Sequence, residues 1–222
     1  MTAPLRPAPS RRSTPEQCPP LESGDGLTSV EFERRYSLRP DIRRADLIEG
    51  VVYVASPMRH VQHGLPQRII STWLGVYQAQ HPEVDGGDGS TVRMDPDNEV
   101  QPDAFLRRRD GTSRETDDDY LEGAPELVVE ISASSAGVDL GPKFRAYRRN
   151  GVQEYVVWQI YENRLDWFVL EDGDYVALAP DSNGTIESRV FPGLRLAVGA
   201  LLERDLAAVL AEQNRKRSKR RA

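Results

Sequence analysis

The sequence has a single cysteine, Cys18, which lies in a proline-rich stretch. One cysteine cannot form a disulfide within the chain and cannot supply a cysteine-based zinc site. Long apolar runs are also missing: nothing approaches the roughly 20 residues that a membrane-spanning helix needs. Residues 1–20 lack the continuous apolar core of a signal peptide. These absences predict an incidental, exposed thiol in a soluble protein of the reducing cytoplasm, with no membrane partner.

Positive charge is scarce outside the last few residues. The formal net charge is −6, yet six basic residues fall within 215–221, so the rest of the chain sums to about −12. Surfaces that bind nucleic acid are normally basic, which makes this balance unusual for an enzyme acting on DNA. The basic tail is either an electrostatic contact for nucleic acid or a solvated end that aids solubility.

Composition divides the chain into three parts. Residues 1–26 are rich in proline, serine, arginine and glycine, and they have too few apolar groups to offset chain entropy, so we expect a disordered segment. Residues 27–212 carry the hydrophobic periodicity of one folded domain that is long enough to bury a core. Residues 213–222 are predicted to form a basic, disordered tail.

Within the domain, the spacing of apolar residues predicts an alternation of helices and strands. Helices are expected over 29–36, 61–80, 142–150 and 199–212. Strands are expected over 51–54, 90–94, 101–106, 127–131, 154–158, 165–169, 175–178 and 189–191, with turns at 49–50, 85–89, 95–98 and 172–173. Residues 107–122 are so charged that we expect a surface loop. This order predicts a mixed α/β fold, with a central mixed β-sheet flanked by helices.

Two carboxylates stand out against this background. Glu130 lies in the most apolar short run of the chain, 127–131, which is typical of a strand buried on both faces. A buried carboxylate is very costly unless it is paired or bound to a metal, although a glutamate facing solvent at the strand end is a competing interpretation. Asp103 starts another predicted strand. If the strands are neighbours, Asp103 and Glu130 converge on one hard cation such as Mg²⁺.

Lys143 is the third candidate. It follows Glu130 by thirteen residues, and Pro142 places it in the first turn of the next predicted helix. A short crossover can bring its ammonium back over the strand end, where it would orient a water molecule or hold a phosphate. A solvated lysine on the helix surface is the competing interpretation.

Three blocks of sequence together resemble the Uma-two family, a group of restriction-endonuclease-like proteins in the PD-(D/E)XK superfamily. The blocks are QPD at 101–103, APELVVEI at 124–131 and KFRAYRRNGVQEY at 143–155. The segment 46–50 and the following Ser56, Pro57 and His60 resemble the N-terminal signature of the family. The resemblance extends over residues 46–175.

The resemblance implies a restriction-endonuclease-like core and metal-dependent hydrolysis of DNA, with Mg²⁺ as the cofactor and Mn²⁺ as its substitute. Asp103 matches the aspartate of the superfamily pattern and Glu130 the (D/E) position, both as catalytic metal ligands. The usual lysine position holds Ser132 here, and Lys143 on the next helix matches the lysine of the family. Because nucleases of this superfamily often cut two strands as dimers, a homodimer is a further expectation.

Additional residues within the matched segments are candidates for the rim of the site. Asp46 and Glu49 each offer one more carboxylate. His60 shuttles a proton, contacts phosphate, or makes only a local hydrogen bond at the helix start. Asp139 is expected to cap the helix rather than pair with the lysine. Tyr147 lies one turn beyond that lysine and shares its face, with core packing as the default expectation.

Two other functions stay open at this point. One is a catalytically silent nuclease-fold module that binds nucleic acid or a protein partner, which the acidic net charge favours. The complete set of aspartate, glutamate and lysine argues against that alternative. The other is a hydrolase acting on a different phosphate ester, because a site of carboxylates, metal and lysine serves phosphoryl chemistry in general.

Overall fold

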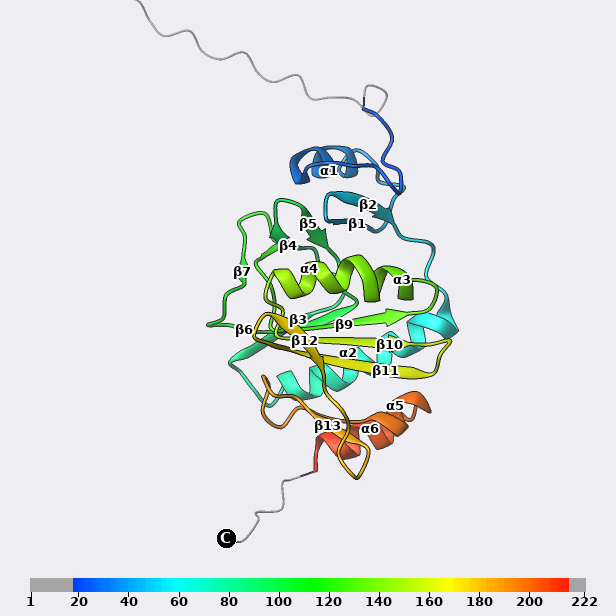
Figure 1. The fold of residues 1–222 in the computed structure, drawn as a ribbon, viewed down its shortest axis with the longest axis vertical. Coiled ribbons are helices and arrows are strands. Elements are labelled where there is room, and N and C mark those ends of the chain that lie inside the picture. The colour runs from blue at the N-terminus through cyan, green and yellow to red at the C-terminus, as the bar shows by residue number, and fades with distance from the viewer. Residues whose placement is uncertain (1–17, 216–222) are drawn as a thin grey trace, which may run out of the picture.

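The structure, a computed structural model, describes residues 18–215 (Figure 1). Most of the predicted N-terminal segment (1–17) and most of the basic tail (216–222) lie outside these residues. Residues 18–26, which we expected to be disordered, pack onto the domain. Leu21 is buried, and the N–H of Gly24 donates to the carbonyl of Val52 at 2.9 Å. This stretch therefore belongs to the folded part of the chain.

The first of two large sheets is built from strands that lie within residues 45–122, in the order β2-β1-β5-β4-β8-β7. Its strands are β1 (Ala45–Ile48), β2 (Val51–Val54), β4 (Val92–Asp95), β5 (Asn98–Val100), β7 (Arg114–Glu115) and β8 (Leu121–Glu122). Glu49 and Gly50, both with positive φ (52° and 75°), form the predicted turn between β1 and β2. Helix α1 (Ser29–Tyr36) covers the sheet by packing Phe32 against Leu47 and Val52.

The second sheet is the central mixed sheet that the sequence predicts, in the order β12-β11-β10-β9-β6-β3. Its strands are β3 (Val84–Gly87), β6 (Ala104–Arg108), β9 (Leu127–Ser132), β10 (Glu154–Gln159), β11 (Arg164–Glu171) and β12 (Asp174–Ala177). Strands β9 and β10 are parallel, and the other pairs are antiparallel. This mixed topology agrees with the predicted fold class.

Helices cover both faces of this second sheet (Figure 1). Side chains alternate along β9, so Val129 packs with Trp73 of α2 (Leu65–Gln78), whereas Val128 packs with Tyr147 of α4 (Phe144–Arg149). Glu130 follows Val129 and therefore faces the same side as Val128. The predicted burial of this strand on both faces is confirmed, because all of its residues are buried.

Two π-helical turns precede the helices that flank this sheet. Turn η2 (His60–Gly64) leads into α2, and α3 (Ala136–Val138) continues through η3 (Asp139–Lys143) into α4. The prediction that Pro142 opens its helix is wrong, because the helical segment begins at Ala136 and Pro142 lies inside it. A proline is tolerated here because the π turn already interrupts the regular hydrogen-bond ladder.

Two predictions for the middle of the chain are also wrong. Residues 85–89 were expected to form a turn, but Gly86 lies in β3, so close to β6 that a Cβ atom would stand 2.6 Å from the carbonyl oxygen of Phe105. The expected surface loop 107–122 contains β7 and β8 and buries Arg107, which pairs with Asp85 at 3.1 Å and Glu115 at 2.6 Å. Pairing between distant charges offsets a burial cost that composition alone cannot assess.

The C-terminal region differs from its predicted form as well. No strand forms over 189–191; a small hairpin of β13 (Thr185–Glu187) and β14 (Arg195–Ala197) flanks these residues instead, and Phe191 is buried there without strand pairing. The predicted last helix is two helices, α5 (Val198–Leu202) and α6 (Leu206–Gln213). The chain breaks at Arg204 (φ 59°) because Asp205 caps α6 through the N–H of Ala208.

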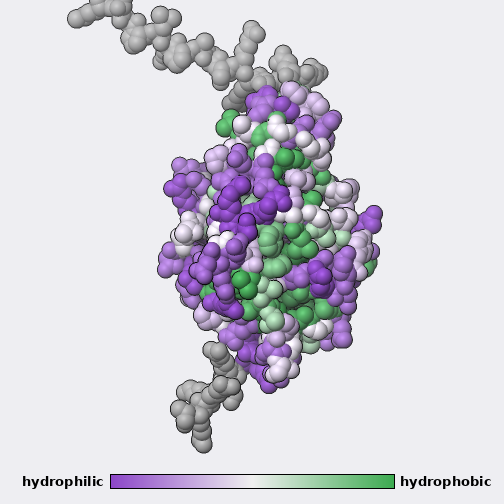
Figure 2. All heavy atoms as spheres, viewed as in Figure 1, coloured by the Kyte–Doolittle hydropathy of each residue, from purple (hydrophilic) through white to green (hydrophobic). Residues whose placement is uncertain are grey.

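The surface combines polar and apolar regions. Figure 2 shows hydrophobic residues gathered in the central part of one face, with hydrophilic residues around them. Isolated exposed apolar side chains are normal on protein surfaces. Over residues 18–215, no helix has both the length and the apolar character that crossing a membrane requires.

Candidate active site

Asp103, Glu130 and Lys143 come together where the two sheets meet. Ala104 of β6 pairs with Val129 of β9, and this register places Asp103, directly before β6, beside Glu130 of β9. The Nζ atom of Lys143 lies 2.8 Å from Oε1 of Glu130. All three residues are buried, with exposed fractions of 2–4%. The structure thus unites the three residues that the sequence singles out.

Lys143 reaches the cluster from the end of η3, and two further carboxylates hold it there. Its Nζ lies 3.1 Å from Oδ2 of Asp46 and 3.8 Å from Oδ1 of Asp139. Oδ1 of Asp46 also accepts the backbone N–H of Gln101 at 2.8 Å. Asp46 and Asp139 therefore contribute to the cluster by fixing the ammonium group.

Asp139 itself is fixed by two hydroxyls. Its Oδ2 accepts hydrogen bonds from Ser132 at 2.5 Å and from Ser135 at 2.6 Å. The expectation that Asp139 caps the helix is wrong, since the residue at the N-cap position of α3 is Ser135. Ser132, at the position where the superfamily usually has its lysine, thus acts one step away from Lys143, through Asp139.

Tyr147 has two roles in the cluster. Its ring is buried in the core between the sheet and α4. Its hydroxyl donates to Oε1 of Glu130 at 2.8 Å. Core packing, the default expectation for this residue, is correct but incomplete, because the hydroxyl also satisfies the buried carboxylate.

Two of the predicted rim residues lie elsewhere. Glu49 sits in the turn after β1, and its carboxylate pairs with Arg145 of α4 at 2.5 Å. His60 is exposed at the start of η2. Its place is taken by His63, three residues later, whose Nε2 lies 3.2 Å from Oδ1 of Asp103. His60 was selected from the resemblance to the family, and the residue pattern alone did not show which histidine faces inward.

Arg44 is a member of the cluster that the sequence analysis missed. Its Nη1 lies 2.6 Å from Oδ1 of Asp103, and its Nη2 donates to the carbonyl of Gln101 and lies 3.9 Å from Oε2 of Glu130. Arg44 precedes β1 at a spacing of two residues from Asp46. This i, i+2 spacing places both residues on one side of an extended chain and was the available signal.

The surroundings move the pKa values of the two central carboxylates in opposite directions. Burial raises the pKa of Glu130 to about 8; nearby Asp103 adds to this effect, and Lys143 only partly offsets it. Burial alone would also raise the pKa of Asp103. His63, Arg44 and Lys143 outweigh that effect and hold the Asp103 pKa well below its usual range. Of the pair, Asp103 thus favours the ionised form and Glu130 the protonated form.

Comparison with known proteins shows the family of this chain. The Uma2 family, whose description is "Putative restriction endonuclease", matches residues 30–199. The chain belongs to the Uma2 family. The resemblance to this family that the sequence blocks indicate is thereby confirmed.

A solved structure has a fold similar to that of this Uma2 protein. It is the crystal structure of "a putative nuclease belonging to DUF820" from Anabaena variabilis ATCC 29413, with a TM-score of 0.58 and 12% sequence identity. The match covers 72% of this chain and 90% of that chain. At this identity the likeness shows the fold alone. A comparison with curated proteins gives no significant match.

The donor set of this Uma2 protein suits Mg²⁺ in one particular form. Mg²⁺ is usually bound by one or two carboxylates together with water and substrate phosphate, and Asp103 and Glu130 provide such a pair. Oε2 of Glu130 lies 3.9 Å from Arg44, beyond hydrogen-bonding distance. In the described part of the chain, no three histidine, cysteine, aspartate or glutamate side chains are arranged as a metal cage. A cation held by these two carboxylates would have to share Oδ1 of Asp103 with Arg44, because Oδ2 accepts the backbone N–H of Ile131 at 2.7 Å.

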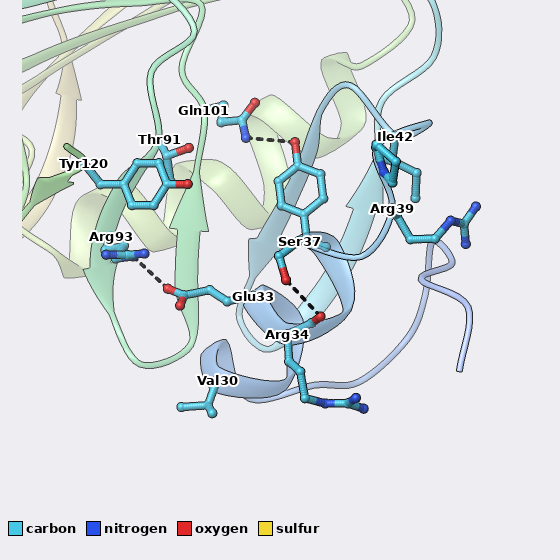
Figure 3. Close-up of a pocket in the computed structure, with 12 residues that line it drawn as sticks. Val30, Glu33, Arg34, Ser37, Arg39, Ile42, Thr91, Arg93, Gln101 and Tyr120 are labelled. Carbon is cyan, nitrogen blue, oxygen red and sulfur yellow. Dashed lines mark hydrogen bonds and ion pairs between the residues drawn. The ribbon is translucent and has the colours of Figure 1, made fainter. Parts of the chain in front are cut away.

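A hollow of about 660 Å³ lies next to this cluster in the first sheet, between α1, the loop that follows it, and β4 (Figure 3). Gln101 connects the two places: its backbone binds Asp46 and Arg44, and its side chain lines the hollow and donates to the Tyr36 hydroxyl at 3.3 Å. Across the hollow, the guanidinium of Arg93 lies 4.3 Å from the centre of the Tyr120 ring. The hollow thus has a mixed polar and aromatic wall.

Proposed function

We propose that this Uma2 protein is a metal-dependent endonuclease that hydrolyses phosphodiester bonds of DNA, with Asp103, Glu130 and Lys143 as its catalytic residues. The observation that carries the proposal is the convergence of these three side chains, from separate segments, in one buried cluster. Membership of a family whose description is "Putative restriction endonuclease" supports DNA as the substrate. Mg²⁺ is the proposed cofactor, with Mn²⁺ able to replace it.

Each residue has a defined part in this chemistry. Asp103 and Glu130 would hold Mg²⁺, which supplies Lewis acidity toward a phosphate oxygen and toward the attacking water. Lys143 is kept protonated, because neighbouring carboxylates outweigh the burial that would lower its pKa. Its N–H groups are placed to offset negative charge that develops on the phosphoryl group. Tyr147 keeps Glu130 oriented through its hydroxyl.

The cellular setting follows from the same proposal. We place the activity in the cytoplasm, where Mg²⁺ is available and the lone Cys18 stays reduced. We also propose a homodimer, because one chain presents one cluster and a double-stranded cut requires two attacks. Each cut is expected to leave a 5′-phosphate end.

The proposal is tested by incubating purified protein with supercoiled plasmid in Mg²⁺, Mn²⁺ or EDTA. Nicked or linear plasmid is expected with either metal and not with EDTA. The Lys143→Ala variant should lose this activity, and circular dichroism should check that it is still folded. Well-folded wild-type protein that cleaves no plasmid with any metal would instead favour a silent binding module.

One observation favours that second candidate. Arg44 and Lys143 already supply positive charge to Asp103 and Glu130 within the protein. A module that had lost its metal would be stabilised in this way. The two candidates are distinguished by Mn²⁺ binding, which only the nuclease requires.

His63 and His60 are expected to differ sharply on substitution. His63→Ala should reduce plasmid cleavage by about 10²-fold, a typical loss for a residue that transfers a proton or positions a phosphate. His60→Ala should leave the rate unchanged, because His60 is exposed and does not contact the cluster. The measurement is the initial nicking rate of both variants at the same Mg²⁺ concentration. Equal rates for the two variants would remove His63 from the active site.

A further inference from the structure

The hollow beside the cluster contains more carboxyl groups than its one central cation can satisfy. Nε of Arg93 lies 2.7 Å from Oε1 of Glu33 and 3.6 Å from Oε2 of Glu99. Nη1 of the same guanidinium lies 2.8 Å from Oδ2 of Asp118. One positive charge is thus shared by three carboxyl groups, which leaves hydrogen-bond acceptors for a ligand that carries N–H donors.

Glu99 is the least satisfied of these three carboxyl groups. It lies in β5 opposite Arg93 of β4, so its side chain is on the same face of the sheet as Arg93, which lines the hollow. Only 5% of Glu99 is exposed, and its Oε2 accepts no hydrogen bond from any residue within 18–215. A buried carboxyl oxygen without a donor is costly, and a donor from a ligand would remove that cost.

Aromatic side chains form part of the wall of the same hollow. Tyr36 and Tyr120 both line it, and its volume of about 660 Å³ is typical of sites for small organic molecules (Figure 3). Tyr120 is 41% exposed, so a planar ligand can reach its ring. Aromatic rings for stacking, combined with polar groups that contact the edge of a base, are the features that hold an unstacked nucleobase.

The hollow is close to the cluster along the chain. Gln101 lines the hollow, and Asp103, two residues later, belongs to the cluster. Two residues of chain span at most about 7 Å, which is on the order of two nucleotide steps along one strand of DNA. A base in the hollow would therefore belong to the strand whose phosphate lies at the cluster.

We propose that the hollow binds one unstacked guanine of the DNA strand, close to the phosphate at the cluster, with Glu99 as the acceptor for its N–H groups. This inference rests on the proposed nuclease function and deepens it by naming the base that is recognised. Guanine has a ring N–H and an amino group side by side, so one carboxylate can accept both. The same edges of adenine, cytosine and thymine lack such a pair of adjacent donors, so each would leave one carboxylate oxygen without a donor.

The proposal is tested with two fluorescent single-stranded thymidine pentanucleotides that carry a central deoxyguanosine or a central deoxyinosine, which lacks only the amino group. Binding to full-length protein is followed by fluorescence anisotropy in low-salt buffer with EDTA, so neither metal nor cleavage is involved. The deoxyguanosine strand should bind about tenfold more tightly, because the buried carboxylate loses one donor with deoxyinosine. Equal affinities, or no binding of either strand, would overturn the inference.

The outcome is separate from that of the nuclease proposal. Plasmid cleavage by a protein that shows no preference for deoxyguanosine would overturn the guanine site and leave the nuclease proposal intact. A preference for deoxyguanosine in a protein that cleaves no plasmid would support the guanine site and favour the silent binding module.

The role of Glu99 has a readout of its own in the pH dependence of binding. Burial raises the pKa of Glu99 to about 8; Glu33 of α1 adds to this effect, and Arg93 of β4 partly offsets it. Because guanine needs the ionised carboxylate, affinity for the deoxyguanosine strand should rise by more than about tenfold from pH 6 to pH 8. Glu99→Gln should lose both this rise and the preference over deoxyinosine. A preference that survives in Glu99→Gln would overturn the inference.

Tyr120 is tested as the stacking wall. Tyr120→Ala should bind both strands about tenfold more weakly, because a stacking partner is lost, and Tyr120→Phe should bind them like the wild type. Tyr161→Ala is the matched control, since Tyr161 is an exposed tyrosine in the turn between β10 and β11 and should not affect binding. Circular dichroism checks that each variant is folded. Unchanged affinity in folded Tyr120→Ala would show that the base does not lie in the hollow.

Discussion

Replacing Glu130 by glutamine is expected to reduce DNA cleavage by about 10³-fold while leaving the fold at least as stable as the wild type. Activity falls because one of the two ligands loses its charge. Stability is kept because the buried carboxylate, with its pKa raised to about 8, is costly to ionise, and a neutral amide removes that cost. Tyr147 can still donate to the amide oxygen, and Lys143 keeps its contact with Asp46.

The difference in stability between Glu130→Gln and the wild type should depend on pH in a defined direction. Since the folded-state pKa of Glu130 is raised from 4.5 to about 8, folding favours its protonated form. The wild type therefore loses stability as the pH rises from about 4.5 to 8, and Glu130→Gln does not lose this part. Denaturant unfolding without metal should show the variant gaining on the wild type over that range, by at most about 5 kcal/mol for a pKa raised from 4.5 to about 8. If the variant is less stable than the wild type at every pH in this range, Glu130 is ionised and well paired in the free protein.

Asp103→Asn provides the contrasting case. Its carboxylate is stabilised in the ionised form, so its contribution is present above a pH of about 3.8 and is lost as the pH falls below that value. Asparagine should abolish cleavage equally but lower the free energy of unfolding by about 2–4 kcal/mol at neutral pH, because Arg44 and His63 lose their charged partner. The two neutral substitutions are thus expected to be alike in activity and opposite in stability.

Lys143→Met is expected to abolish cleavage and to lower the free energy of unfolding by about 3–5 kcal/mol. Removing the ammonium leaves Asp46, Glu130 and Asp139 close together without their shared counter-charge. The loss should be smaller at pH 5 than at pH 8, because Glu130, whose pKa burial raises to about 8, is protonated at the lower pH and then adds less repulsion. Chemical denaturation at both pH values measures the difference.

The double variant Lys143→Met/Glu130→Gln tests the cause of that loss. If unpaired charge is responsible, removing one carboxylate should recover part of the stability, and the two effects should not be additive. Arg145→Met is the matched control, since Arg145 is on the exposed face of the same helix and pairs with Glu49. This control should change stability by less than about 1 kcal/mol. Strict additivity in the double variant would indicate lost packing rather than unbalanced charge.

The sequence indicated candidates for the centre of the site because a charged residue in an apolar segment is unusual. A carboxylate within the apolar run 127–131 needs a partner, which made Glu130 a candidate beside the alternative of a solvent-facing glutamate, and the resemblance to the family assigned its role. Lys143 has no such local signal, and its assignment came from the resemblance to the family. The mixed sheet with helices on both faces followed from long, strongly periodic segments such as α2 and β9, where local preference and burial agree.

Other features depend on contacts that local patterns do not contain. Arg44 follows another arginine and looks like part of an exposed basic pair, and only its distant partner Asp103 makes it a buried cation. His60 was singled out because it lies in a segment that resembles the N-terminal signature of the family, whereas the fold brings His63 to Asp103 and leaves His60 exposed. Strand β3 was missed because Gly86 normally indicates a turn, whereas close approach to β6 requires a glycine there.

The ionic cluster also links the first sheet to the second sheet and its helices. Asp46 comes from β1 of the first sheet, whereas Lys143 belongs to the helical segment that packs on the second. Arg44 likewise reaches across to Asp103, which precedes β6. If the first sheet opened alone, buried charges on the remaining half would lose their counter-ions, so partial opening is strongly disfavoured. The two sheets should therefore melt as one cooperative unit, with the site that performs the chemistry as the point that couples them.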